Sequence, residues 1–83
     1  MNNINSLSTL ISKAGFESYG NFRTEDKAIQ CEIFTATKGK YCGENIELYY
    51  DYNTGVITKV EQYCQFPVNH PHYSPVKFTV PVS

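Results

Sequence analysis

Histidine and cysteine are the side chains of this sequence best suited to chemistry, and they gather in or beside its loops. His70 and His72 stand two residues apart in a proline-rich stretch, and Cys64 precedes that stretch. Thiolate and imidazole are ordinary zinc ligands, so this set predicts a metal site as one alternative. The spacing contains no Cys-x2-Cys pair, which structural zinc sites commonly use. We therefore expect no cofactor, and we keep His70, His72 and Cys64 as the alternative ligand set.

A cysteine nucleophile is a second chemical alternative. Cys42 stands beside Gly43, and His70 or His72 together with Asp51 would supply a base and an orienting acid. The chain has no Gly-x-Ser-x-Gly nucleophile motif. Without geometry, such a set of residue types identifies no enzyme. The prediction is therefore that the protein is not an enzyme, with a small cysteine-dependent enzyme as the alternative.

Tyrosine gives the stronger functional signal, because several of the seven tyrosines fall in one predicted hairpin. Side chains alternate between the two faces of a strand, so Tyr50 and Tyr52 are expected to point towards the core. An exposed tyrosine offers a large contact area at low entropic cost, which favours protein interfaces. The residues on the opposite face form the predicted protein-binding site: Tyr49, Lys59, Tyr63, Glu47 and Glu61. The alternative is that another part of the chain covers this face.

The hairpin is indicated by two strand patterns, residues 45–52 and 56–65, that flank Asn53-Thr54-Gly55. This tripeptide fits a type I turn with Gly55 in the left-handed bulge position. The resulting register pairs Tyr52 with Val56, Tyr50 with Thr58, Leu48 with Val60, Ile46 with Gln62, Tyr49 with Lys59 and Glu47 with Glu61. Directly opposed glutamates are unfavourable, which is an indication that a basic group of a partner belongs there.

The other elements follow from periodicity. Apolar residues at three- and four-residue steps predict a helix over residues 4–14, with Asn3 or Asn5 as its cap. Alternation predicts a strand over residues 28–37, with Ile29, Cys31 and Ile33 on one face. The tail 76–82 is expected to form an edge strand with Val76, Phe78, Val80 and Val82 inward. A short strand over 16–23 is a further possibility, with Phe16, Tyr19 and Phe22 buried.

Together these elements predict one α+β domain over residues 1–83, with an N-terminal helix packed on a four- to five-stranded antiparallel sheet. Such a short chain builds a thin core, so a homodimer is a reasonable expectation. The net charge of −1 makes duplex nucleic acid an unlikely partner, because such binders carry a basic excess. No apolar run is long enough for a membrane span. The odd number of cysteines, three, favours the reducing cytoplasm.

In size and layout, the chain is similar in general character to phage or mobile-element inhibitors, including anti-CRISPR proteins. It shares with them a composition rich in Asn, Ile, Lys and Tyr, but no specific motif. The resemblance implies an inhibitor of a host system. The predicted function is therefore a small non-enzymatic module that binds another protein or protein complex. It would bind through the tyrosine-bearing face, the Pro/His loop or the edge strand.

Overall fold

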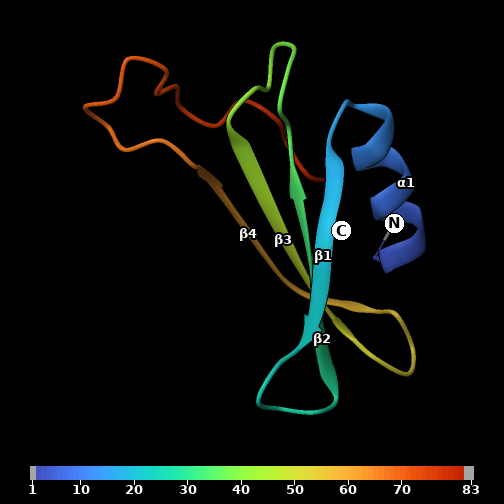
Figure 1. The fold of residues 1–83 in the computed structure, drawn as a ribbon. Helices are drawn as coiled ribbons and strands as arrows, with labels where there is room; N and C mark the ends of the chain where they lie inside the picture. The colour runs from blue at the N-terminus through green and yellow to red at the C-terminus, as the bar shows by residue number, and fades with distance from the viewer. Residues whose placement is uncertain (1, 82–83) are drawn as a thin grey trace.

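The computed structural model describes residues 2–81 of the chain. Its elements, in chain order, are α1 (Ile4–Lys13), β1 (Glu17–Arg23), β2 (Ile29–Thr35), β3 (Glu44–Asp51) and β4 (Ile57–Cys64). The strands form one antiparallel sheet in the order β1-β2-β3-β4, and α1 lies on one side of it (Figure 1). This confirms the predicted α+β class and the N-terminal helix. Among the described residues, no helix has the length and apolar character needed to cross a membrane.

The helix begins and ends where its sequence signals indicate. Asn3 is the N-cap, and its side-chain oxygen accepts the N–H of Asn5 at 2.9 Å. After the last turn, Gly15 adopts φ +108°, which allows the N–H of Phe16 to donate to the carbonyl of Ile11 at 3.3 Å. The apolar stripe of α1 packs on the sheet, and burial of that stripe stabilises a helix too short to form alone. The core cluster consists of Ile4, Leu7, Ile11, Phe16, Phe34, Ala36, Ile46, Leu48, Ile57 and Val80.

The hairpin register is confirmed over most of its length and shifts near the turn. Leu48 faces Val60, but a bulge between Tyr49 and Tyr50 makes Tyr50 face Ile57. The predicted Tyr50–Thr58 and Tyr52–Val56 pairs are therefore wrong. The reason is the turn, because Asp51 rather than Tyr52 closes it. The remaining predicted pairs that stand are Ile46 with Gln62, Tyr49 with Lys59 and Glu47 with Glu61.

Asp51 organises this turn through both its backbone and its carboxylate. Its carbonyl accepts the N–H of Gly55 at 2.8 Å, and its Oδ1 accepts the N–H groups of Asn53 and Thr54 at 2.9 Å. Tyr52 is consequently part of the turn and 51% exposed, instead of pointing into the core as predicted. The Arg23 guanidinium lies 3.5 Å from the centre of the Tyr52 ring.

Ile29, Cys31 and Ile33 share one face of β2, as alternation predicted, and that face points away from α1. Phe34 packs in the core under α1, whereas Cys31 and Ile33 lie on the opposite face. The expected burial of Tyr19 and Phe22 is wrong, since they are 63% and 46% exposed. Both belong to β1, an edge strand that contributes no residue to the core cluster, because α1 packs over the other three strands.

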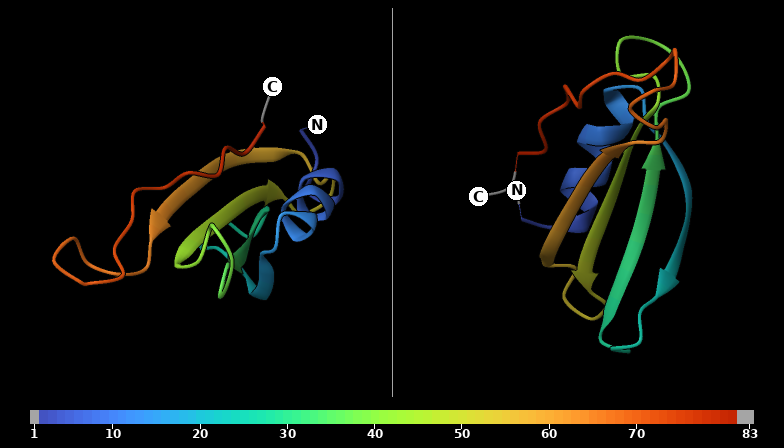
Figure 2. Two further views of the ribbon diagram at one scale, coloured as in Figure 1. Left: turned by 90° about the horizontal axis from the view of Figure 1, so that it is seen from above. Right: turned by 90° about the vertical axis from the view of Figure 1, so that its left-hand side faces the viewer.

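The predicted strand over 76–82 is not formed: residues 76–81 lie alongside β4 without ladder pairing (Figure 2), and Val82 falls outside the described residues. Side chains replace the ladder. The Glu44 carboxylate accepts the N–H groups of Lys77 and Phe78 at 3.0 and 3.2 Å. The Gln62 amide donates to the carbonyl of Phe78 at 2.8 Å. Phe78 and Val80 do pack inward, but Val76 is 38% exposed, which corrects its predicted burial.

A substitution at Gly55 should destabilise the protein by about 1–3 kcal/mol, because the residue has φ +78° and an alanine there is strained. The added Cβ would also lie 3.0 Å from Nδ2 of Asn3, the helix cap. Gly39 is the matched control, with φ +82° and nothing within 4 Å of its added Cβ. We expect Gly55→Ala to lower the free energy of unfolding more than Gly39→Ala in chemical denaturation. Equal losses would show that contact with the helix cap has no energetic weight.

The turn should also lose stability in acid. N–H donation from Thr54, and then from Asn53, lowers the pKa of Asp51 below its ordinary value of 3.8. Its contribution is therefore complete above 3.8 and is lost as the pH falls through the lowered folded-state value. The difference in unfolding free energy between the wild type and Asp51→Ala should be greatest at neutral pH and shrink below 3.8. A difference that is constant with pH would contradict the role of the carboxylate.

Candidate functional site

The face of the sheet that points away from α1, which we call the open face, carries an aromatic patch. The register across all four strands places its residues in rows. One row is Phe22, Cys31, Tyr49 and Lys59. The next row is Gly20, Ile33, Glu47 and Glu61, and the third is Glu17, Thr35, Asn45 and Tyr63. The structure thus gathers all five predicted site residues on one face, as period-2 alternation requires.

Glu47 holds the two tyrosines of the patch in place. The Tyr49 hydroxyl donates to its Oε1 at 3.0 Å, and the Tyr63 hydroxyl donates to its Oε2 at 2.9 Å. Tyr49 is half-buried and Tyr63 is 41% exposed. One carboxylate therefore orients two rings, and hydrogen bonds to a charged acceptor are the stronger kind.

The electrostatics of the patch keep both hydroxyls protonated. The hydrogen bond to Glu47, followed by burial, raises the pKa of Tyr49 far above its ordinary value of 10.0. For Tyr63, the side chain of Asn45 lowers the pKa, but burial and the bond to Glu47 together raise it above 10.0. Both tyrosines therefore act as hydrogen-bond donors at physiological pH.

The opposed carboxylates of Glu47 and Glu61 interact with different side chains. Glu61 forms an ion pair with Lys59, whose Nζ lies 3.2 Å from its Oε1. Both side chains are about half exposed, so solvent screens the pair and it adds little stability. The Lys59 ammonium also lies 4.9 Å from the centre of the Tyr49 ring. The glutamate pair is thus accommodated within the chain, and a basic partner group at this place stays a prediction.

Cys31 lies beneath the patch. It is fully buried yet separate from the core cluster, because its direct neighbours across the ladder are Phe22 and Tyr49 of the open face. Burial, followed by the charge of Glu47, raises the pKa of the Cys31 thiol. A buried, protonated thiol is a packing residue rather than a nucleophile. Phe22 and Ile33 are the patch residues that sequence reasoning missed, and only the pairing of β1 with β2 reveals them.

The alternative metal ligands do not form a three-ligand set, although the rings of His70 and His72 lie 5.4 Å apart between centroids. The rings of Phe66 and His70 stack with centroids 4.5 Å apart, and the N–H of His72 donates to Nδ1 of His70 at 3.0 Å. One ring nitrogen of His70 is therefore occupied by a backbone donor. Over residues 2–81, no three His, Cys, Asp or Glu side chains lie close enough to hold a metal ion. Cys64 accordingly does not complete a three-ligand set with His70 and His72.

The proposed cysteine triad is not assembled either. Cys42 is exposed, and its thiol donates to the carbonyl of Thr37 at 3.3 Å. Asp51 ends β3, whereas Cys42 precedes the start of that strand. Eight residues of strand separate such positions by about 25 Å. The acid is therefore far from the thiol that it would have to serve.

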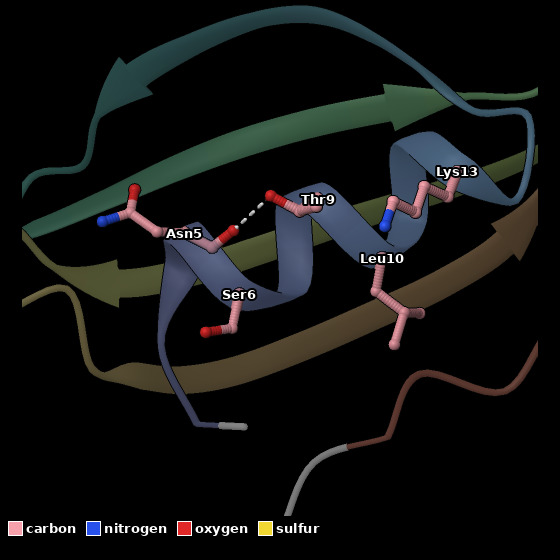
Figure 3. A pocket seen from close by; sticks show the side chains of 5 residues that line it. All are labelled: Asn5, Ser6, Thr9, Leu10 and Lys13. Carbon is pink, nitrogen blue, oxygen red and sulfur yellow. Dashed lines mark hydrogen bonds between the residues drawn. The ribbon is translucent and has the colours of Figure 1, made fainter.

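A shallow hollow on the solvent side of α1 is the other concave feature of interest (Figure 3). All the residues that line it come from successive turns of α1: Asn5, Ser6, Thr9, Leu10 and Lys13. The Thr9 hydroxyl donates to the carbonyl of Asn5 at 2.9 Å, which satisfies that group within the helix. The residues that line the hollow include neither a carboxylate nor a thiol. The hollow lies on the side of the sheet away from the open face.

None of the protein-family models, curated proteins or solved structures compared with this chain matches it.

The three thiols should react in the order of their exposure. In the folded protein, a maleimide should label Cys42 first and Cys31 last, because Cys31 is buried and its pKa is raised. Tyr49→Ala should accelerate labelling of Cys31, since Tyr49 lies directly opposite it. Tyr63→Ala, which removes the other ring held by Glu47, is the matched control and should accelerate it much less. Mass spectrometry of labelled peptides gives the rates, and equal labelling of Cys31 and Cys42 in the wild type would rule out this burial.

Proposed function

We propose that this protein is a non-enzymatic binding module that docks its open face on another protein or protein complex. One observation carries the proposal: Phe22 and Tyr63, 46% and 41% exposed, lie on a sheet face against which no helix or strand of residues 2–81 packs. Ile33 and Tyr49 add half-buried apolar surface between them.

The composition of this face supports a protein partner. The solvated face of an antiparallel sheet is usually polar, whereas here each row contributes an aromatic or aliphatic side chain. Protein interfaces favour aromatic anchors surrounded by a charged rim. Lys59, Glu61 and Glu17 provide such a rim at the ends of the rows. Since Glu47 already fixes the two tyrosine rings, little side-chain entropy is lost when a partner contacts them.

The open face is a better docking surface than the edge of the sheet at β1. The edge strand β1 contains a bulge between Ser18 and Gly20, and Gly20 has φ +138°. Bulges and charged ends, here Glu17 and Arg23, are the devices by which edge strands resist pairing with other chains. The irregular backbone of this edge opposes pairing with a strand of another chain. Binding through the side chains of the open face is therefore favoured.

A host-system protein is the class of partner that the size and layout of the chain favour. Small size and α+β layout are shared with phage or mobile-element inhibitors such as anti-CRISPR proteins, and this favours a partner from a host system. Three free thiols, one of them exposed, fit a reducing cytoplasm as the compartment. A second copy of this chain is the other partner that the open face would suit, and a concentration-dependent molecular mass would reveal it.

Removing the exposed anchors should abolish partner capture and leave the fold intact. The variant Phe22→Ala with Tyr63→Ala should bind a partner captured from the native host at least roughly thirtyfold more weakly, which corresponds to about 2 kcal/mol. Each of these exposed residues should contribute within about 0.5 kcal/mol to the unfolding free energy. The dissociation constant for the purified partner and the melting temperature are the two measurements.

Tyr73→Ala is the matched control for this experiment, because Tyr73 is 37% exposed and belongs to the proline-rich loop. It should leave the affinity unchanged. If Tyr73→Ala weakens binding while the double variant binds normally, the interface is the loop and the proposal fails. If the double variant is unfolded, these rings stabilise the domain itself, and Tyr63→Phe with unchanged stability then tests the hydroxyl at the interface.

A further inference from the structure

The C-terminal segment is bound to the rest of the molecule as an extended peptide would be bound by a receptor. It forms no ladder with β4, and its polar contacts come from side chains of the sheet. We call residues 76–81 the tail, and the surface that receives them the tail groove. The groove lies on the α1 side of the sheet, away from the open face, so the inference below does not depend on the proposed function.

Recognition of the tail is concentrated on a few atoms. The Glu44 side chain, in a residue only 3% exposed, accepts two successive N–H groups, those of Lys77 and Phe78. Gln62 donates to the carbonyl of Phe78. A buried carboxylate without hydrogen-bond donors carries a large cost in free energy. An occupant of the groove that supplies N–H donors to Glu44 removes this cost.

The side chains of the tail complete this recognition. The Phe78 ring lies 5.1 Å from the Phe16 ring and 5.2 Å from the Tyr41 ring, measured between centroids. Val80 is 7% exposed and belongs to the core cluster. The groove therefore binds a phenylalanine side chain and, two residues later, a small aliphatic side chain.

The connection to the tail is separate from this groove. Residues 67–73 form an exposed loop that projects from the end of the sheet (Figure 1). Its backbone hydrogen bonds are local, from the N–H of His70 to Pro67 and from the N–H of Tyr73 to His70. Ten residues, 66–75, reach roughly 33 Å when extended, which is comparable with the dimensions of the molecule, 40 × 26 × 20 Å. The tail can therefore reach the groove of a neighbouring copy once this loop opens.

We propose that two copies of this chain exchange their tails reciprocally, so that each tail fills the tail groove of the other copy. The contacts of Glu44, Gln62 and the aromatic pocket are then the same within one chain or between two, and opening of the loop is the structural change. A tethered segment competes at an effective concentration in the millimolar range. The exchanged dimer should therefore increase with protein concentration.

A complementation experiment separates exchange from binding within one chain. Glu44→Gln damages the groove and keeps the tail, because the amide presents a donor where the carboxylate accepted N–H groups. Phe78→Ala damages the tail and keeps the groove. In either variant alone, every complex of a tail with a groove contains one damaged component. In a mixture, the intact tail of the Glu44→Gln chain can bind the intact groove of the Phe78→Ala chain, and this complex forms only between chains.

The expected result is a dimer in the mixture, measured by light scattering, that is absent from each variant alone. In nitrogen-15-labelled Phe78→Ala protein, the amide signals of Glu44 and Phe16 should return to their wild-type positions when unlabelled Glu44→Gln protein is added. If both variants are folded and the mixture shows neither change, the exchange does not occur. Recovery with a synthetic peptide of residues 74–81, but not with the Glu44→Gln chain, would also overturn it, since the groove would then accept a segment that a second copy does not deliver.

Should either variant fail to fold, Gln62→Ala and Val80→Ala provide a milder pair with the same logic. Gln62 belongs to the groove and Val80 to the tail. Formation of a dimer in that mixture alone supports the exchange, and its absence from folded variants refutes it.

Discussion

A single ten-residue helix has to cover a four-stranded sheet, and this shortage of covering material shapes the rest of the molecule. Such a helix is about 15 Å long, while a strand of eight residues is about 26 Å long. It can shield part of one face. The chain places α1 over β2, β3 and β4, and it leaves β1 without a share in the core. Two consequences follow, one on each side of the sheet.

On the α1 side, the tail supplies the missing cover. Phe78 and Val80 extend the apolar layer beyond the helix, next to Phe16 and Tyr41. A fifth strand would also cover this area, but the tail forms no ladder. Its N–H groups at Lys77 and Phe78 donate to Glu44, and the carbonyl of Phe78 accepts from Gln62. Because buried polar groups must be paired, this arrangement satisfies the carboxylate and the tail at once. It also makes the tail a ligand of its own domain.

On the opposite side, no helix or strand of residues 2–81 covers the sheet, and the residues of this face interact with one another. Glu47 accepts both tyrosine hydroxyls, Lys59 pairs with Glu61, and Tyr49 shields Cys31. These contacts stiffen an apolar surface without hiding it. The molecule therefore has two separate surfaces with different chemistry: an exposed aromatic face, and a groove that holds the extended tail.

The sequence by itself determined the features that depend on neighbours close in the chain. The 3.6-residue period and Asn3 define α1, and Gly55 with its positive φ defines the turn between β3 and β4. Period-2 alternation placed Glu47, Tyr49 and Tyr63 on one face, because that pattern holds whatever packs against the strand.

Tertiary structure decided which face was covered. Alternation could not tell that Phe34, rather than Cys31 and Ile33, would lie under α1, or that Phe22 would join the patch across the ladder. It also could not reveal that Glu44, more than 30 residues earlier in the chain, would take the tail's N–H groups from a ladder. Each of these outcomes depends on contacts between distant segments, and their energies appear only when the chain is folded.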